Sequence, residues 1–202
     1  MYDSMIFDMD GTLVNFVKQI TDSWNLSCQK YNWNKVFKVE EIQSVMGLNS
    51  HDIGVALFPD IDEKESQRRI EICSAEEVDY IFTHMGICYI PNEKFLIDLS
   101  KKYRLFIVSN CLNGYIEMFL SYFHYEKYFI ETVNSSNGRS KGENIRYLVD
   151  KYHLKSPVYI GDTIKDALSS KEANVEFIHA SYGFGKVDCK LKINKLEDLA
   201  KI

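Results

Sequence analysis

Apolar runs alternate with helical patterns along the second half of the chain. Four short apolar runs are typical of buried strands: 104–109, 128–133, 157–160 and 175–179. Five stretches have a helical pattern: 91–102, 114–122, 141–152, 165–172 and 196–202. Strands that alternate with helices in this way predict βαβ units, so we expect an α/β domain with a parallel sheet.

The segment between residues 16 and 87 has a different pattern, with helical periodicity and little strand signal. Four apolar sets recur in it at helical spacing: 17–26, 42–46, 55–58 and 70–82. Four short helices inserted after the first strand would form a separate helical cap domain. We therefore expect residues 1–15 and 88–202 to form the core domain and residues 16–87 to form the cap.

The first apolar run, residues 5–7, ends in two aspartates, Asp8 and Asp10, with Gly11 and Thr12 directly after them. Burial of a carboxylate costs free energy unless the group is paired or binds a metal. Residues two positions apart in a strand point to the same side, which predicts that both aspartates reach one site. Taken alone, however, an Asp-Gly-Thr sequence is most often a turn followed by a helix cap.

Polar residues also follow the later predicted strands. They are Ser109, Asn110, Lys141 before its helix, Gly161, Asp162, Thr163 and Asp166. Ligands of an open parallel sheet bind at the carboxyl ends of its strands, so we expect these groups to converge with the two aspartates at one edge. Carboxylates, a lysine, hydroxyls and an amide together suit a hard cation and a phosphate. Each group alone is common in loops, and only their combination favours a site.

Composition and charge narrow the range of partners. The 202 residues are 46% hydrophobic and 26% charged, which is typical of a soluble globular protein. The net charge of −5 gives no electrostatic reason to expect nucleic acid or an anionic membrane as a partner. The sequence lacks an apolar run of the ~18 residues that a membrane span needs, and its five cysteines have no Cys-x-x-Cys spacing. We expect a cytoplasmic protein with reduced thiols.

These motifs resemble those of the haloacid dehalogenase superfamily, and in particular its phosphatase branch with an inserted helical cap. FDMDGTL is similar to the first motif of that family, IVSN to the second, Lys141 within GRSKGENI to the third and GDTIKD to the fourth. The stretches SNCLNGYIEMFL and ASYGFG resemble members of the phosphoglycolate phosphatase type. The resemblance implies a Rossmann-like, doubly wound parallel sheet with an α-helical C1-type cap.

The resemblance also implies roles for individual residues. Asp8 would attack phosphorus and form an aspartyl-phosphate, and Asp10 would act as general acid and then as general base. The residues expected to hold the phosphoryl oxygens are Gly11, Thr12, Ser109, Asn110 and Lys141, of which Lys141 also belongs to the catalytic set. Mg²⁺ would be bound by Asp8, Asp10 through its carbonyl, and Asp162. Asp166 is expected either to support the metal site or to orient Lys141.

The function that these features favour is a Mg²⁺-dependent phosphatase for the phosphomonoester of a small metabolite, acting as a monomer or homodimer. Phosphoglycolate, sugar-phosphate and nucleotide substrates all remain open. The alternatives are a phosphomutase of the same fold and a non-catalytic phosphate-binding regulatory protein, although Asp8 with Asp10 favours an enzyme. Asn49, Ser50 and His51 are expected either to contact the substrate or to form a surface loop with a helix cap at Ser50.

Overall fold

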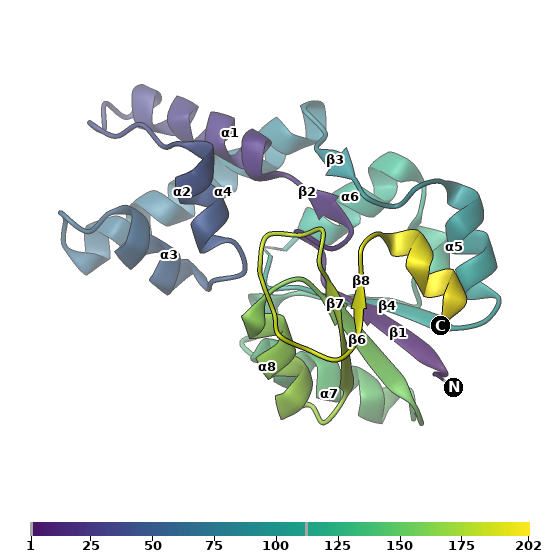
Figure 1. Ribbon diagram of the computed structural model, residues 1–202. Helices are drawn as coiled ribbons and strands as arrows, with labels where there is room; N and C mark the ends of the chain where they lie inside the picture. The colour runs from purple at the N-terminus through teal and green to yellow at the C-terminus, as the bar shows by residue number, and fades with distance from the viewer. Residues whose placement is uncertain (1, 112) are drawn as a thin grey trace. The chain divides into compact units, whose positions relative to one another are not determined.

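The computed structural model describes residues 2–111 and 113–202, and it forms two compact units (Figure 1). The core unit contains Met1–Asn15 and Cys88–Ile202, and the helical unit contains Phe16–Ile87. Leu112, within the stretch SNCLNGYIEMFL, lies outside the described residues. Each unit is described here by itself.

The core unit contains a six-stranded sheet in the order β5-β4-β1-β6-β7-β8. Its strands are β1 (Ser4–Phe7), β4 (Arg104–Val108), β5 (Glu131–Val133), β6 (Pro157–Gly161), β7 (Glu176–Ala180) and β8 (Lys192–Ile193). All neighbouring strands are parallel, and Phe7 at the end of β1 pairs with Ile107 of β4 and Ile160 of β6. The chain builds outward from β1 on one side and then on the other, which is the arrangement of a doubly wound sheet.

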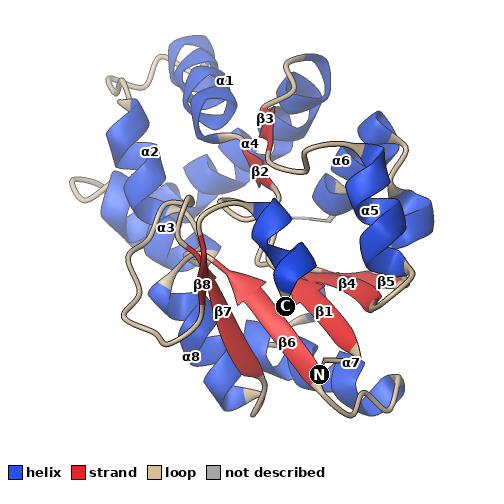
Figure 2. Ribbon diagram, turned by 45° about the vertical axis from the view of Figure 1, so that its right-hand side comes forward, coloured by secondary structure: helices blue, strands red, loops and turns tan. Residues whose placement is uncertain are grey.

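Helices cover both faces of this sheet (Figure 2). They are α5 (Glu93–Ser100), α6 (Tyr115–Phe123), α7 (Lys141–Lys151) and α8 (Ile164–Glu172), with short 3₁₀ helices η1 (Glu126–Tyr128), η2 (Ser135–Asn137) and η3 (Leu196–Lys201). On the face covered by α7 and α8, Ile6, Phe106 and Tyr159 of the strands pack with Ile145 and Leu148 of α7. Alternate strand residues therefore form the core on each side.

The observed elements differ from the predicted ones at several ends. The expected strand at 128–133 is shorter, because Tyr128 belongs to η1 and only Glu131–Val133 pair with β4. The C-terminal helix is a 3₁₀ helix, and β8 lies in a segment where no strand was expected. Two further short strands, β2 (Val14–Asn15) and β3 (Ile87–Cys88), pair where the chain passes between the two units.

The helical unit contains α1 (Val17–Lys30), α2 (Val39–Val45), α3 (Ser50–Leu57) and α4 (Glu63–Thr83). The number of helices matches the expectation, but α4 is 21 residues long and is not a short helix. Side-chain caps begin two of them, since Asn49 accepts the amide of Asp52 and Asp62 accepts the amide of Glu65. None of the helices in the described ranges has both the length and the apolar character needed to span a bilayer.

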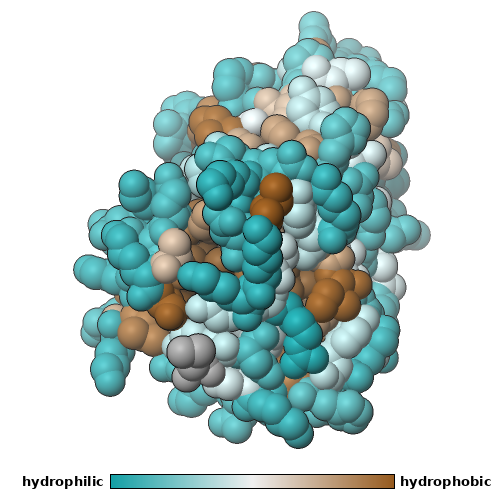
Figure 3. Space-filling model, turned by 90° about the vertical axis from the view of Figure 1, so that its right-hand side faces the viewer, coloured by the Kyte–Doolittle hydropathy of each residue, from teal (hydrophilic) through white to brown (hydrophobic). Residues whose placement is uncertain are grey.

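The surface has no single large hydrophobic area on the side drawn in Figure 3, where hydrophobic side chains form several separate groups among hydrophilic ones. Three residues of the predicted apolar helical sets, Leu26, Val55 and Phe82, are more than half exposed. Isolated exposed apolar side chains are normal on soluble proteins. The five cysteines are free thiols, as expected.

A carboxylate is buried in the helical unit, between α1 and α4. Glu77 is 7% exposed, and Trp24 Nε1 donates a hydrogen bond to its Oε2 at 2.7 Å. Burial raises the pKa of Glu77 from 4.5 to about 7, against the lowering effect of the Trp24 hydrogen bond. The folded helical unit therefore favours the protonated form of this side chain.

We expect Glu77→Gln to stabilise the protein above pH 7 and to change its stability little below pH 4.5. Between these values the unfolded chain has released the Glu77 proton and the folded chain has kept it, so the free energy of unfolding of the wild type falls as the pH rises. Urea titrations of both proteins from pH 4 to pH 8 measure the difference. Glu76→Gln is the matched control: hydrogen bonds from Lys30 and Ser27 lower the pKa of Glu76, so this variant should lose stability at neutral pH. A pH-independent difference for Glu77→Gln would contradict the prediction.

Candidate active site

Asp8 and Asp162 lie at the ends of the two central strands, next to the point where the sheet changes its direction of growth. Asp8 follows β1 directly, and its amide donates to Ile160 O of β6 at 2.8 Å. Asp162 follows β6, and both side chains are buried, with 4% and 0% of their surface exposed. Ligands of doubly wound sheets bind at this position.

Lys141, at the start of α7, joins two of the buried carboxylates. Its Nζ lies 2.8 Å from Asp8 Oδ1 and 2.7 Å from Asp166 Oδ1. Burial acts to lower the pKa of Lys141, but the charges of Asp166 and Asp8 outweigh it and raise the pKa well above its usual range. The lysine is therefore a permanently charged, buried cation, and not a solvated surface lysine.

Asp166 is fixed from several sides. Its Oδ2 accepts the amide of Thr163 at 2.9 Å and the hydroxyl of Thr163 at 2.6 Å, in the capping box that begins α8. Burial acts to raise its pKa, but the Lys141 charge and these hydrogen bonds outweigh it and lower the pKa. Asp166 thus remains an anion that holds Lys141 in place, which is one of the two roles expected for it.

The three buried aspartates carry more negative charge than Lys141 neutralises. Oxygen atoms of Asp8, Asp162 and Asp166 all lie within 4.8 Å of one another. Burial and the charge of Asp166 raise the pKa of Asp8 to about 6. Burial and the charges of Asp8 and Asp166 raise the pKa of Asp162 to about 8. Asp162 Oδ1 is buried without a hydrogen-bond partner among the described residues. An oxygen-rich, electron-rich cluster with an unpaired carboxylate oxygen fits a hard divalent cation such as Mg²⁺.

Gly11 permits the turn that brings the first motif against Asp162. Its φ of +84° lies in the left-handed region, and a Cβ at this position would be only 2.2 Å from Asp162 Oδ2. Asp162 Oδ2 also accepts the amide of Phe184 at 2.6 Å. Loops after β1 and β7 thus enclose one carboxylate.

The remaining residues predicted for the first motif lie beside this cluster. Asp10 is half-buried, and its Oδ1 accepts the hydroxyl of Tyr115 at 3.1 Å. Thr12 is fully buried, and its Oγ1 has no hydrogen-bond partner among the residues described. The carbonyl of Thr12 accepts the hydroxyl of Tyr182 at 2.8 Å. A buried hydroxyl without a partner is typical of a group that meets a ligand.

Ser109 and Asn110 follow β4, as predicted. Ser109 is buried and its amide donates to Val133 O at 3.0 Å, whereas Asn110 is half-buried. The hydroxyl of Ser135 donates to the carbonyls of Asn110 and Cys111 at 3.1 and 3.2 Å. This contact ties the loop after β4 to the loop after β5.

Several contacts of the site were not predicted from the sequence. They come from Tyr115, Tyr159, Tyr182 and the amide of Phe184, and Tyr159 donates to Val108 O and to Asp166 Oδ1 at 3.0 and 3.3 Å. The only sequence signal for two of them is the stretch ASYGFG, which contains Tyr182 and Phe184.

The polar segment proposed for substrate contact is already engaged within the helical unit. Asn49, and not Ser50, caps α3, and Ser50 is the first residue of that helix. His51 is exposed, with its ring nitrogens 3.3 Å from Asp52 Oδ1 and 3.1 Å from Glu63 Oε1. The expected helix cap at Ser50 is therefore wrong by one residue, because the side chain that accepts the Asp52 amide belongs to Asn49.

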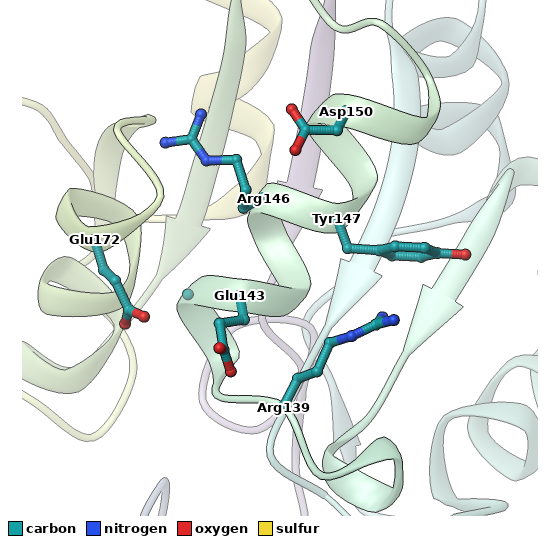
Figure 4. A pocket seen from close by; sticks show the side chains of 7 residues that line it. Arg139, Glu143, Arg146, Tyr147, Asp150 and Glu172 are labelled. Atoms are coloured by element: carbon teal, nitrogen blue, oxygen red, sulfur yellow. The ribbon is translucent and has the colours of Figure 1, made fainter.

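A separate surface pocket lies along α7, and its lining includes none of Asp8, Asp162 and Asp166 (Figure 4). Its lining includes Arg139, Arg146, Glu143, Asp150 and Glu172, and its charges are mixed in sign. The guanidinium of Arg139 lies 4.6 Å from the centre of the Tyr147 ring. Exposed, mutually compensating charges of this kind do not define a binding site.

The fold is that of an α/β protein of the Rossmann-like type, with a cluster of buried aspartates at the switch point of its sheet. The sequence profile of the haloacid dehalogenase-like hydrolases matches residues 5–180, and the chain therefore belongs to this family. The expected superfamily, its fold and its class of enzyme, the hydrolases, are confirmed.

Similar proteins support this placement. A phosphoglycolate phosphatase from Psychrobacter arcticus is 25% identical over 193 residues, which cover 89% of this chain and 84% of the relative. The crystal structure of a predicted phosphatase from Clostridium acetobutylicum has a TM-score of 0.83 and 23% identity, covering 100% of this chain and 97% of that chain. A haloacid dehalogenase-like hydrolase from Streptococcus pneumoniae has a TM-score of 0.84 and 19% identity, covering 99% and 98%. These structures share the fold.

We expect opposite effects of two substitutions on the stability of the metal-free protein. Lys141→Met leaves Asp8 and Asp166 buried without their shared cation, and it should cost roughly 3 kcal/mol or more. Burial and the neighbouring carboxylates raise the pKa of Asp162 to about 8, so Asp162→Asn removes an anion only above about pH 8, where stability should be equal or higher. Urea unfolding in excess chelator measures both variants. Equal stability of the wild type and Lys141→Met would show that the lysine does not hold the cluster together.

Proposed function

We propose that this protein is a Mg²⁺-dependent phosphatase that hydrolyses the phosphomonoester of a small metabolite through an aspartyl-phosphate on Asp8. The observation that carries the proposal is the ion pair of Asp8 with buried Lys141, beside Asp162 Oδ1, which has no hydrogen-bond partner within residues 2–111 and 113–202. This arrangement supplies a nucleophile, a fixed positive charge and a buried carboxylate oxygen that could bind a metal ion. Membership of a hydrolase family and the similarity to a phosphoglycolate phosphatase support it.

The metal would be held by Asp8, Asp162 and the main-chain carbonyl of Asp10, with Asp166 close by. A Mg²⁺ ion held there would offset the charge of the carboxylates and polarise a phosphoryl oxygen. The protein's own contribution is to keep these oxygens together before any ligand arrives: Gly11 allows the close approach of the first motif to Asp162, and the Phe184 amide fixes Asp162 Oδ2.

The proposed reaction has two steps, which are the formation of the aspartyl-phosphate and its hydrolysis. In the first, a carboxylate oxygen of Asp8 forms a bond to phosphorus while the bond to the leaving oxygen breaks, and Asp10 gives that oxygen its proton. In the second, Asp10 takes a proton from water, the water oxygen attacks phosphorus, and the bond to Asp8 breaks. Inorganic phosphate leaves, Asp8 is a free carboxylate again, and Asp10 is protonated for the next cycle.

The phosphoryl oxygens would be held by the donors that surround Asp8. Thr12 offers a buried hydroxyl that has no partner among the described residues, and Ser109 and Asn110 lie on a loop that Ser135 fixes. Lys141 adds a positive charge that stabilises the phosphoryl oxygens in the trigonal transition state. Gly11 contributes the backbone turn of the first motif. Fixed donors of this kind cost little reorganisation during the reaction.

For the substrate, we propose a small phosphorylated metabolite, with phosphoglycolate first among the candidates because of the Psychrobacter arcticus relative. We also propose that residues 16–87 act as the cap that selects among such substrates, in a cytoplasmic monomer or homodimer. Phosphate release from a panel of metabolites that includes phosphoglycolate, sugar phosphates and nucleotides, with and without Mg²⁺, tests the function. No release from any of them would contradict it.

We expect Asp8→Asn to abolish turnover, because an amide cannot form the aspartyl-phosphate. Its thermal stability should equal or exceed that of the wild type, because the substitution removes one anion from a cluster that raises the pKa of Asp8. Phosphate release and a melting curve measure the two effects. The exposed Asp150 of α7 provides the same chemical change away from the site, and Asp150→Asn should keep wild-type activity. Turnover by purified, mass-verified Asp8→Asn would exclude Asp8 as the nucleophile.

We expect activity to require Mg²⁺, to disappear in chelator and to be inhibited by Ca²⁺. Ca²⁺ accepts more oxygen ligands than Mg²⁺, so it can engage the Asp8 oxygen that has to attack phosphorus. Binding has its own measurement: Mg²⁺ should raise the melting temperature of the wild type and of Asp150→Asn, and much less that of Asp162→Asn. Full activity in excess chelator would exclude the metal site.

A further inference from the structure

Tyr115 lies against the carboxylate of Asp10, although 105 positions separate the two residues in the chain. It is the first residue of α6, directly after Gly114 in a left-handed conformation, and only 2% of its surface is exposed. Its hydroxyl donates to Asp10 Oδ1, with 3.1 Å between the oxygens. A buried tyrosine normally requires a partner for its hydroxyl, and here that partner is a carboxylate of the proposed active site.

This hydrogen bond distinguishes the two oxygens of Asp10. A carboxyl oxygen that carries no proton is the stronger acceptor, so the hydrogen bond from Tyr115 to Oδ1 favours Oδ2 as the oxygen that holds a proton on Asp10. A backbone bridge to Val14 fixes the main chain of Asp10, but the half-buried carboxylate also needs side-chain contacts to stay in one orientation. Tyr115, itself held in the core, supplies such a contact.

We infer that Tyr115 is a positioning residue for proton transfer: it holds Oδ1 of Asp10 so that Oδ2 gives its proton to the leaving oxygen. The inference rests on the proposed phosphatase function. As the bond from phosphorus to the leaving oxygen breaks, the electron pair stays on that oxygen, which takes the Oδ2 proton, while Asp8 forms its bond to phosphorus. Tyr115 itself keeps its proton and does not touch the substrate.

Two aryl esters of similar shape provide the test. Phenolate is a strong base and depends on protonation as it leaves, whereas p-nitrophenolate is a weak base and depends on it much less. With Mg²⁺ present, Tyr115→Phe should lower kcat/KM for phenyl phosphate by about tenfold, the scale of one lost hydrogen bond to a charged group. For p-nitrophenyl phosphate the loss should stay below about threefold. The ratio kcat/KM reports the first phosphoryl transfer.

Tyr125→Phe is the matched control, because it removes the hydroxyl of another buried tyrosine, just after α6, and should change neither rate. Should Tyr115→Phe be unfolded by its melting curve, Tyr115→Met carries the same test with a flexible side chain. Equal losses on both esters, no loss, or a change confined to KM would overturn the role of Tyr115. If the wild type is active and Tyr115→Phe does not change the relative kcat/KM of the two esters, only the role of Tyr115 is overturned. If the wild type hydrolyses neither ester, the proposed function is overturned as well.

Discussion

The ammonium group of Lys141, held between Asp8 and Asp166, is the interaction on which the rest of the site depends. Three buried carboxylates within a few ångströms repel one another, and one buried cation offsets only part of that repulsion. Capped helix starts hold both ends of the contact, since Ser140 caps α7 directly before Lys141 and Thr163 caps α8 just before Asp166. The remaining excess of negative charge favours the binding of a cation at this cluster.

The order of strands and helices in the core unit could be predicted because buried parallel strands are continuous apolar runs that the sequence displays directly. Elements that depend on distant partners could not. The two-residue strand β8 forms only because β7 presents an open edge, and no local pattern indicates it. In the helical unit, periodicity predicted the helices, but Leu26 and Val55, which belong to its apolar sets, are exposed. Helical spacing alone does not determine which apolar side chains are covered.

The residues of the candidate site also fall into two groups, those that the sequence predicted and those that it did not. Asp8, Lys141 and Asp162 could be predicted because each directly follows a strand or begins a helix, where the topology brings them together. Tyr115 and the Phe184 amide could not, since their roles depend on how loops far apart in the sequence pack against one another. The sequence left two roles open for Asp166, and its contact with Lys141 favours the one in which it orients the lysine.

The pairing of β2 with β3 has a consequence for how the chain folds. Ser4 of β1 pairs with Arg104 of β4, and the whole helical unit lies between these two residues in the sequence. Formation of the central sheet therefore requires the closure of a very long loop. Such closure costs conformational entropy that grows slowly with loop length, but it slows folding. A helical unit that folds first, with its two ends joined by β2 and β3, reduces that loop to residues 8–13 and 89–103. Early folding of the insert would thus accelerate assembly of the sheet, and the insert can vary in length with little effect on the sheet's stability.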